Sequence, residues 1–128
     1  MSDYVCIVVP VYVRPQSMVD EQACLGVLVR CPEADVYACR LATDDERVKS
    51  RILGFFPKFG RDNLERVLAW ASHDIEFAFE AERKGDKGAF ANLIRPRENV
   101  LRYGEPQALL TTDPASELAG LYRRAVGD

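Results

Sequence analysis

The residues of this sequence best suited to chemistry are three arginines that lie close together. Arg95, Arg97 and Arg102 occur in the segment RPRENVLR. In extended backbone Arg95 and Arg97 point to the same side, and Arg102 can fold near them, so each can grip a carboxylate or a phosphate. With Glu21, in a loop that enters a strand, they are the candidate residues of a small-anion or nucleotide-binding enzyme. The alternative is that they are solvated charges that protect an edge strand from unwanted pairing.

A second candidate site lies in the longest expected helix. Trp70 and Phe77 are about two helical turns apart, on a side that differs from the main apolar stripe, with His73 between them. Either this helix is buried on two sides, or the three residues form a surface that binds a protein partner. For His73, the sole histidine, the alternative is a surface side chain over a secondary apolar face.

Other chemistries find little support. The four cysteines have apolar neighbours and no spacing typical of zinc, which favours buried structural thiols in a reducing compartment. No glycine-rich phosphate motif occurs, and no nucleophile has an obvious base. The acidic run Asp44–Glu46 is explained by helix capping. We therefore predict no catalytic residues, no metal and no cofactor.

Composition indicates an ordinary globular chain. It has 128 residues, 48% of them hydrophobic, and a net charge of −3, which argues against nucleic acid as a partner. No apolar run approaches the ~18 residues of a membrane span. The N-terminus lacks a basic leader. We expect one domain over residues 1–128, cytoplasmic, with no membrane partner.

The first third of the chain predicts strands at 4–13, 23–31 and 36–42, joined as an antiparallel meander. The first is apolar on both faces, which is typical of a central strand. Pro10 implies a bulge or an exposed edge, because it cannot donate a ladder hydrogen bond. Gly26 marks a bulge or a close approach of another group.

Helix signals follow. TDDE at 43–46 predicts a capping box with Thr43 as N-cap, and DNLE at 62–65 predicts a second, opening a helix that runs to about residue 84. Asp113 and Pro114 predict the cap and first position of the final helix. Short strands are expected at 93–94, 100–103 and 107–112.

These elements predict an α+β fold. Their order is βββ-αα-ββ-α, which suits a mainly antiparallel sheet with three helices packed on one of its faces.

The chain also resembles a family of small bacterial proteins that share a domain of unknown function, DUF3037. The resemblance rests on DEQACLGVLV (20–29), LIRPRENVLRY (93–103) and QALLTTDPASELAGLYRRAV (107–126), and spans nearly the whole chain. Cys24 stands where the family usually has asparagine. The resemblance implies no known activity; some members look to be encoded beside HipA-like kinase-fold proteins, which hints at a protein partner.

The leading hypothesis is a non-enzymatic domain that binds or regulates another protein through Trp70, His73 and Phe77. One alternative is the anion- or nucleotide-binding enzyme described above. Another is an inhibitor protein of a phage or mobile element. A homo-oligomer is compatible with each of them.

Overall fold

The structure is a computed structural model that describes residues 3–15, 21–96 and 100–127. Its α-helices and strands, in chain order, are β1 (Tyr4–Val13), β2 (Ala23–Cys31), β3 (Val36–Leu41), α1 (Glu46–Phe55), α2 (Arg61–Arg83), α3 (Ala89–Ile94), β4 (Leu101–Tyr103), β5 (Gln107–Thr111) and α4 (Leu118–Val126). Short 3-10 turns occupy Pro32–Ala34, Ala42–Asp44 and Pro114–Glu117. The α+β class is confirmed.

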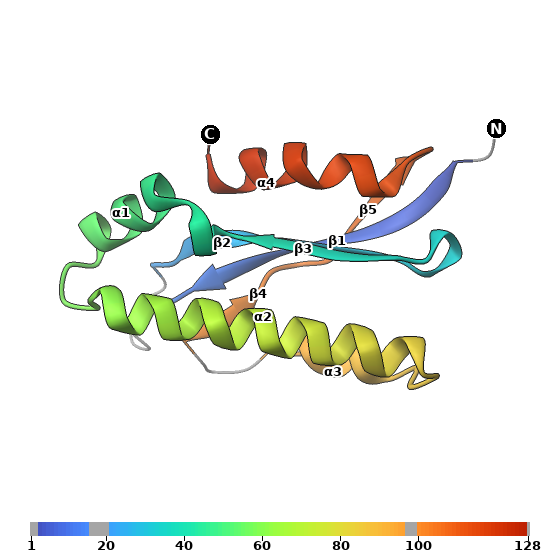
Figure 1. Ribbon diagram of the computed structural model, residues 1–128, viewed down its shortest axis with the longest axis horizontal. Helices are drawn as coiled ribbons and strands as arrows, with labels where there is room; N and C mark the ends of the chain where they lie inside the picture. The colour runs from blue at the N-terminus through green and yellow to red at the C-terminus, as the bar shows by residue number, and fades with distance from the viewer. Residues whose placement is uncertain (1–2, 16–20, 97–99, 128) are drawn as a thin grey trace.

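The helices cover both faces of the sheet rather than one. Figure 1 shows α4 above the sheet and α2 with α3 below it, while α1 lies beyond one end. The prediction of helices on one face was wrong. The reason is visible in β1 and β2, whose residues are apolar on both faces and so require two covering layers.

The sheet has five antiparallel strands in the order β3-β2-β1-β4, and β5 also pairs with β1. β4 and β5 share one side of β1: β5 pairs with its first half and β4 with its last residues. The gap between them lies at Pro10, whose carbonyl accepts a hydrogen bond from the N–H of Gly104 at 2.9 Å. A Cβ at Gly104 would lie 2.6 Å from Cγ of Pro10, so the strands approach closely here. Pro10, which has no N–H to donate, therefore lies at a break in the ladder between β5 and β4, next to the register shift at Val11 and Tyr12, and not at an exposed edge.

Gly26 is both a bulge neighbour and a point of close approach, as predicted. The β1–β2 register shifts between Val11 and Tyr12, opposite Gly26 and Cys24. Gly26 has φ +153°, and a Cβ there would lie 2.0 Å from the backbone oxygen of Arg40. Only glycine fits this position.

The core stripe of α2 agrees with the helical spacing in the sequence. The buried residues of α2 are Leu64, Val67, Leu68, Ala71, Ile75, Ala78 and Phe79. Together with Val9, Val11 and Val13 of β1 they belong to the larger hydrophobic cluster.

The segment before β4 differs from its prediction. Leu93 and Ile94 belong to helix α3, not to a strand, so the described chain has four α-helices rather than three. Phe90 and Leu93 are buried in the core that α3 shares with α2. Tertiary packing thus overrides the weak local preference of two apolar residues for a strand.

Three helix starts also differ from their predictions. The N-cap of α1 is Asp45, not Thr43, and its side chain accepts from the N–H of Val48 at 3.2 Å. α2 begins two residues earlier than its predicted capping box, with Gly60 rather than Asp62 as N-cap and no side-chain cap. Asp113 precedes a 3-10 turn and its side chain makes no cap hydrogen bond; instead the Thr111 hydroxyl accepts from its N–H at 3.1 Å.

One ion pair ties α2 to the sheet. The Arg30 guanidinium on β2 donates to both oxygens of Glu82 on α2, from Nε at 2.7 and 2.9 Å and also from Nη2. It also lies 4.7 Å from the ring centre of Phe90 on α3. The side chain of Glu82 is 8% exposed, so Arg30 neutralises a nearly buried carboxylate.

Candidate aromatic binding site

The most distinctive surface feature is a hollow of about 670 Å³ at the end of the molecule where α1 and α2 join. Its aromatic lining comes from Phe55, Phe56, Phe59 and Trp70, and we call it the aromatic hollow. Phe55 is 75% and Trp70 57% exposed, whereas Phe56 and Phe59 also pack on the core. Two rings are therefore anchored and two are left in contact with solvent.

The turn between α1 and α2 carries two of these rings, Phe56 and Phe59. Phe56 accepts at its carbonyl from the N–H of Phe59 at 3.0 Å, with Pro57 at the second position of the turn, where its fixed φ is favoured. Asn63 donates from Nδ2 to the carbonyl of Phe59 at 2.6 Å. Gly60 then has φ +85°, a conformation that suits glycine, and the chain enters α2.

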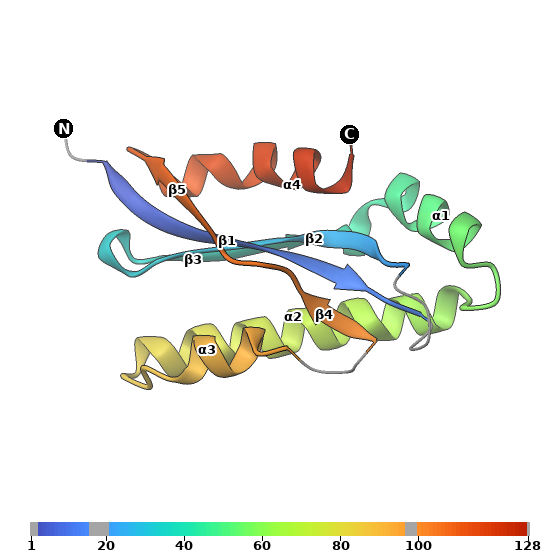
Figure 2. The same ribbon diagram turned by 180° about the vertical axis from the view of Figure 1, so that it is seen from behind.

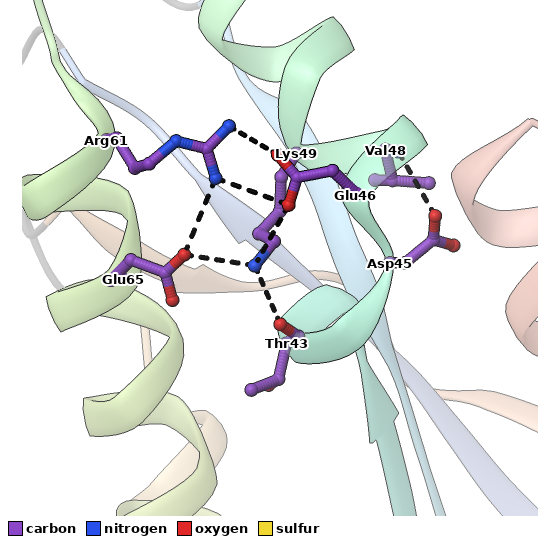
Figure 3. Close-up of polar contacts among 7 residues, drawn as sticks. All are labelled: Thr43, Asp45, Glu46, Val48, Lys49, Arg61 and Glu65. Carbon is purple, nitrogen blue, oxygen red and sulfur yellow. Dashed lines mark hydrogen bonds and ion pairs between the residues drawn. The ribbon is translucent and has the colours of Figure 1, made fainter.

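A polar network holds the two helices on either side of this turn (Figure 3). Nζ of Lys49, on α1, donates to the Thr43 carbonyl at 2.8 Å and to Glu65, on α2, at 3.0 Å. Arg61 donates to Glu46. Lys49 is only 7% exposed, so its ion pair with Glu65 fixes α1 against α2. The ion pair thereby also holds the turn at residues 56–59, which we call the aromatic turn.

Hydrogen bonds within this network shift the pKa values of Lys49 and Glu46. Its hydrogen bond to Glu65 raises the pKa of Lys49, and the hydrogen bond from Arg61 lowers the pKa of Glu46. Lys49 and Glu46 are therefore charged near neutral pH, and they contribute positioning rather than proton transfer.

The charged residues around the hollow are unlike those of the network. Lys58, Arg66 and Glu21 line it, which gives two cations to one carboxylate. Among the described residues none of the three has an ion-pair partner. The hollow thus combines exposed aromatic area with an excess of unpaired positive charge.

The predicted partner-binding residues all lie on the exposed side of α2. Trp70 is 57% and Phe77 72% exposed, and the His73 side chain is 82% exposed. The surface alternative is therefore the observed one, and α2 is not buried on a second side at these positions. Trp70 lines the aromatic hollow, while Phe77 lines a different hollow further along α2.

That second hollow has a volume of about 1250 Å³, and only some of the predicted anion-binding residues line it. Arg95 and Arg102 line it, whereas Glu21 lines the aromatic hollow. Arg97 lies outside the described residues. Arg95 donates to the Asn92 side chain at 3.1 Å. The structure brings two of the arginines into one concavity, and it places Glu21 in another.

In the described part of the chain, the cysteine thiols and the candidate metal ligands give no further sign of a reactive site. All four cysteines are free thiols, and burial and the neighbouring Cys31 raise the pKa of Cys6 to about 11. A thiol with such a pKa is a poor nucleophile near neutral pH. Within residues 3–15, 21–96 and 100–127, no group of acidic, His and Cys side chains is arranged to hold a metal ion. No helix in the same ranges is long and apolar enough to cross a membrane.

The phenylalanines of the aromatic hollow were not predicted from the sequence. The segment FFPKF, residues 55–59, has three aromatic residues around a proline, and this density fits neither helical nor strand periodicity. Apolar residues that follow no period at a helix–helix turn are the signal that identifies such a surface.

Fold and site together define a class: an α+β domain with an antiparallel sheet between helices and an aromatic hollow at one end. A protein-family comparison matches residues 9–126 to DUF3037, described as a protein of unknown function. The chain belongs to this family. No curated protein and no solved structure matches it.

Proposed function

We propose that this chain is a cytoplasmic protein-binding domain that holds an apolar side chain of its partner in the aromatic hollow. The observation that carries the proposal is the exposure of Trp70 and Phe55 in one concavity. Large aromatic side chains contribute strongly to binding when a partner removes them from water. Phe56 and Phe59 are partly buried and pack against the core, so this part of the lining is held in place before a partner binds.

The charges of the hollow indicate the chemistry of the partner. Lys58 and Arg66 outnumber Glu21, and they have no partner among the described residues. A segment with an aromatic or large aliphatic side chain next to Asp or Glu satisfies both features. Such charges mainly speed association and select against basic partners. A kinase-fold protein, as the resemblance suggested, remains a prediction for the whole partner.

The catalytic alternative is less well supported. It needs Glu21 to act together with the arginines, and these residues line separate hollows. An inhibitor protein of a phage or mobile element would also act by binding a protein, so the same surface and the same test apply to it.

A display selection tests the proposal. Random peptides are selected on the wild-type domain and then screened against Trp70→Ala and Phe77→Ala. Phe77 is the matched control, because it is an even more exposed aromatic residue on the same helix, outside the aromatic hollow. We expect acid-flanked aromatic or leucine peptides that lose binding to Trp70→Ala and keep it to Phe77→Ala. Peptides that bind both variants as well as the wild type would sink the proposal.

A charge reversal tests the chemistry of the partner. Arg66→Glu leaves the aromatic rings in place and changes the sign of one rim charge. The selected peptides should bind this variant several-fold more weakly at low salt, with the difference shrinking as salt screens the charges. An unchanged affinity at low salt would contradict the acidic partner.

A further inference from the structure

The outer edge of β5 is an unpaired strand edge. β5 pairs with β1 on one side, and the remaining described strands do not pair with it. In Figure 2 the side of the sheet formed by β5 and β4 faces the viewer, and no helix is drawn in front of it. An edge of this kind presents a row of backbone donors and acceptors that a further strand can use.

This edge lacks the usual protection against another strand. Residues 107–111, QALLT, include no charged residue and no proline. Leu110 is 63% exposed, and Val5, directly opposite it on β1, is 55% exposed. Directly opposite residues share a face of the sheet, so the two side chains form one exposed apolar pair beside the edge.

The opposite edge of the sheet, strand β3, has charged side chains that oppose pairing with a further strand. β3 carries Arg40, whose guanidinium lies 4.8 Å from the ring centre of Tyr122. Arg83 lies over Tyr37 of β3 at 4.7 Å and reaches Asp35 at 3.9 Å. Charged side chains thus lie along β3, and they are missing from β5.

Successive residues of a strand direct their backbone N–H and C=O groups alternately to its two sides, and this alternation shows which groups of β5 face outward. The carbonyl of Pro10 accepts from Gly104 on this side of β1, so every second residue of β1 directs its backbone here. Cys6 is four residues before Pro10, so it directs its backbone groups to the same side, where it is paired with Leu109. The residues of β5 that turn their N–H and C=O groups away from β1 are therefore Ala108 and Leu110.

We propose that β5 pairs antiparallel with β5 of a second copy of this chain, about a two-fold axis at Leu109. In this register Ala108 of one copy and Leu110 of the other exchange backbone hydrogen bonds. The exposed Leu110 then lies beside the partner's Ala108, a large side chain against a small one. Two identical uncharged strands meet without like-charge repulsion, and isologous pairing closes the assembly as a dimer. An uncharged strand offers no charge pattern that would select a foreign strand instead.

Sedimentation equilibrium of the wild type and Leu110→Lys tests the pairing. Lysine on an exposed edge position opposes strand pairing and leaves the buried core intact. We expect a wild-type dimer at micromolar concentration and a monomer for Leu110→Lys, with both variants giving the same circular dichroism spectrum. Phe77→Lys is the matched control, since it replaces another highly exposed apolar residue, away from the edge, and it should remain dimeric.

Amide hydrogen exchange locates the contact. The N–H groups of Ala108 and Leu110 should exchange at least ten-fold more slowly in the wild-type dimer than in Leu110→Lys. The proposal is overturned by a wild-type monomer at 100-fold higher protein concentration, or by a dimer that Leu110→Lys leaves unchanged. It is also overturned if these two amides exchange equally fast in both proteins, which would place the contact elsewhere.

Discussion

Replacing Gly26 by alanine should cost more stability than any conservative surface change in this protein. The new Cβ would lie 2.0 Å from the Arg40 oxygen and 2.8 Å from Cα of Leu41, both atoms of the β3 backbone. Backbone atoms cannot rotate away, so β3 must move by about 1 Å to reach even a tight contact. Alanine must also adopt φ +153°, which L side chains rarely do.

The magnitude follows from these two effects. Strain of the backbone costs about 1–3 kcal/mol, and overpacking of a filled site costs about 1–3 kcal/mol more. Together they give a loss of about 2–6 kcal/mol, a large share of the roughly 5–15 kcal/mol that stabilises a domain. Gly26→Ala should therefore be only marginally folded.

Urea unfolding measures this loss. The control is Gly120→Ala, the same chemical change inside α4, where a Cβ would meet nothing within 4 Å. That variant should gain about 0.5–1 kcal/mol, because alanine is the better helix former. Circular dichroism reports all elements, and the single tryptophan, Trp70, reports α2. A Gly26→Ala loss below about 1 kcal/mol, within the range of ordinary substitutions, would refute the close approach of β2 and β3.

Two further predictions concern polar contacts. Arg30→Met should cost about 3 kcal/mol in urea unfolding, because it leaves Glu82 nearly buried without its cation. Arg61→Ala breaks an exposed ion pair and should cost much less; equal losses would contradict this ranking. Tyr122→Phe should cost about 1–2 kcal/mol at neutral pH, since its hydroxyl donates to Asp45 at 2.9 Å and lowers the pKa of that carboxyl. A carboxyl group whose pKa is lower in the folded state than its value of about 3.9 in the unfolded state stabilises the fold at pH values above about 3.9. This contribution to stability is lost as the pH falls through the folded-state pKa. The difference between Tyr122→Phe and wild type should shrink between neutral and strongly acidic pH, and a pH-independent difference would argue against the assignment.

The strand meander and α2 were predictable because their signals are long and repeat. The strand at 23–31 matches β2, and the stripe from Leu64 to Phe79 matches the buried face of α2. Alternation and helical spacing recur along these segments, so a single exception cannot change the assignment.

Short elements and caps were not predictable in the same way. α3 has six residues, and it is tertiary contact with α2 that makes Leu93 helical rather than extended. Thr43 and Asp45 both have side chains that cap, and the 3-10 turn at Ala42–Asp44 decides in favour of Asp45.

The candidate site was predicted in part. Helical spacing placed Trp70 and Phe77 on one side of α2, but whether another element covers that side depends on the position of α3 and of the aromatic turn. The separation of Glu21 from Arg95 and Arg102 depends on how distant loops pack, which local pattern does not encode.

Isothermal titration of a selected acid-flanked aromatic peptide tests the central claim most directly. The titration compares the wild type with Trp70→Ala and Phe77→Ala. Trp70→Ala should weaken binding by at least about ten-fold, or 1.4 kcal/mol, as expected for a buried aromatic anchor. Phe77→Ala should bind within about two-fold of the wild type, less than the smallest effect expected of a binding hot spot. Equal affinity for all three proteins would contradict the account, because the aromatic hollow would then play no part in binding.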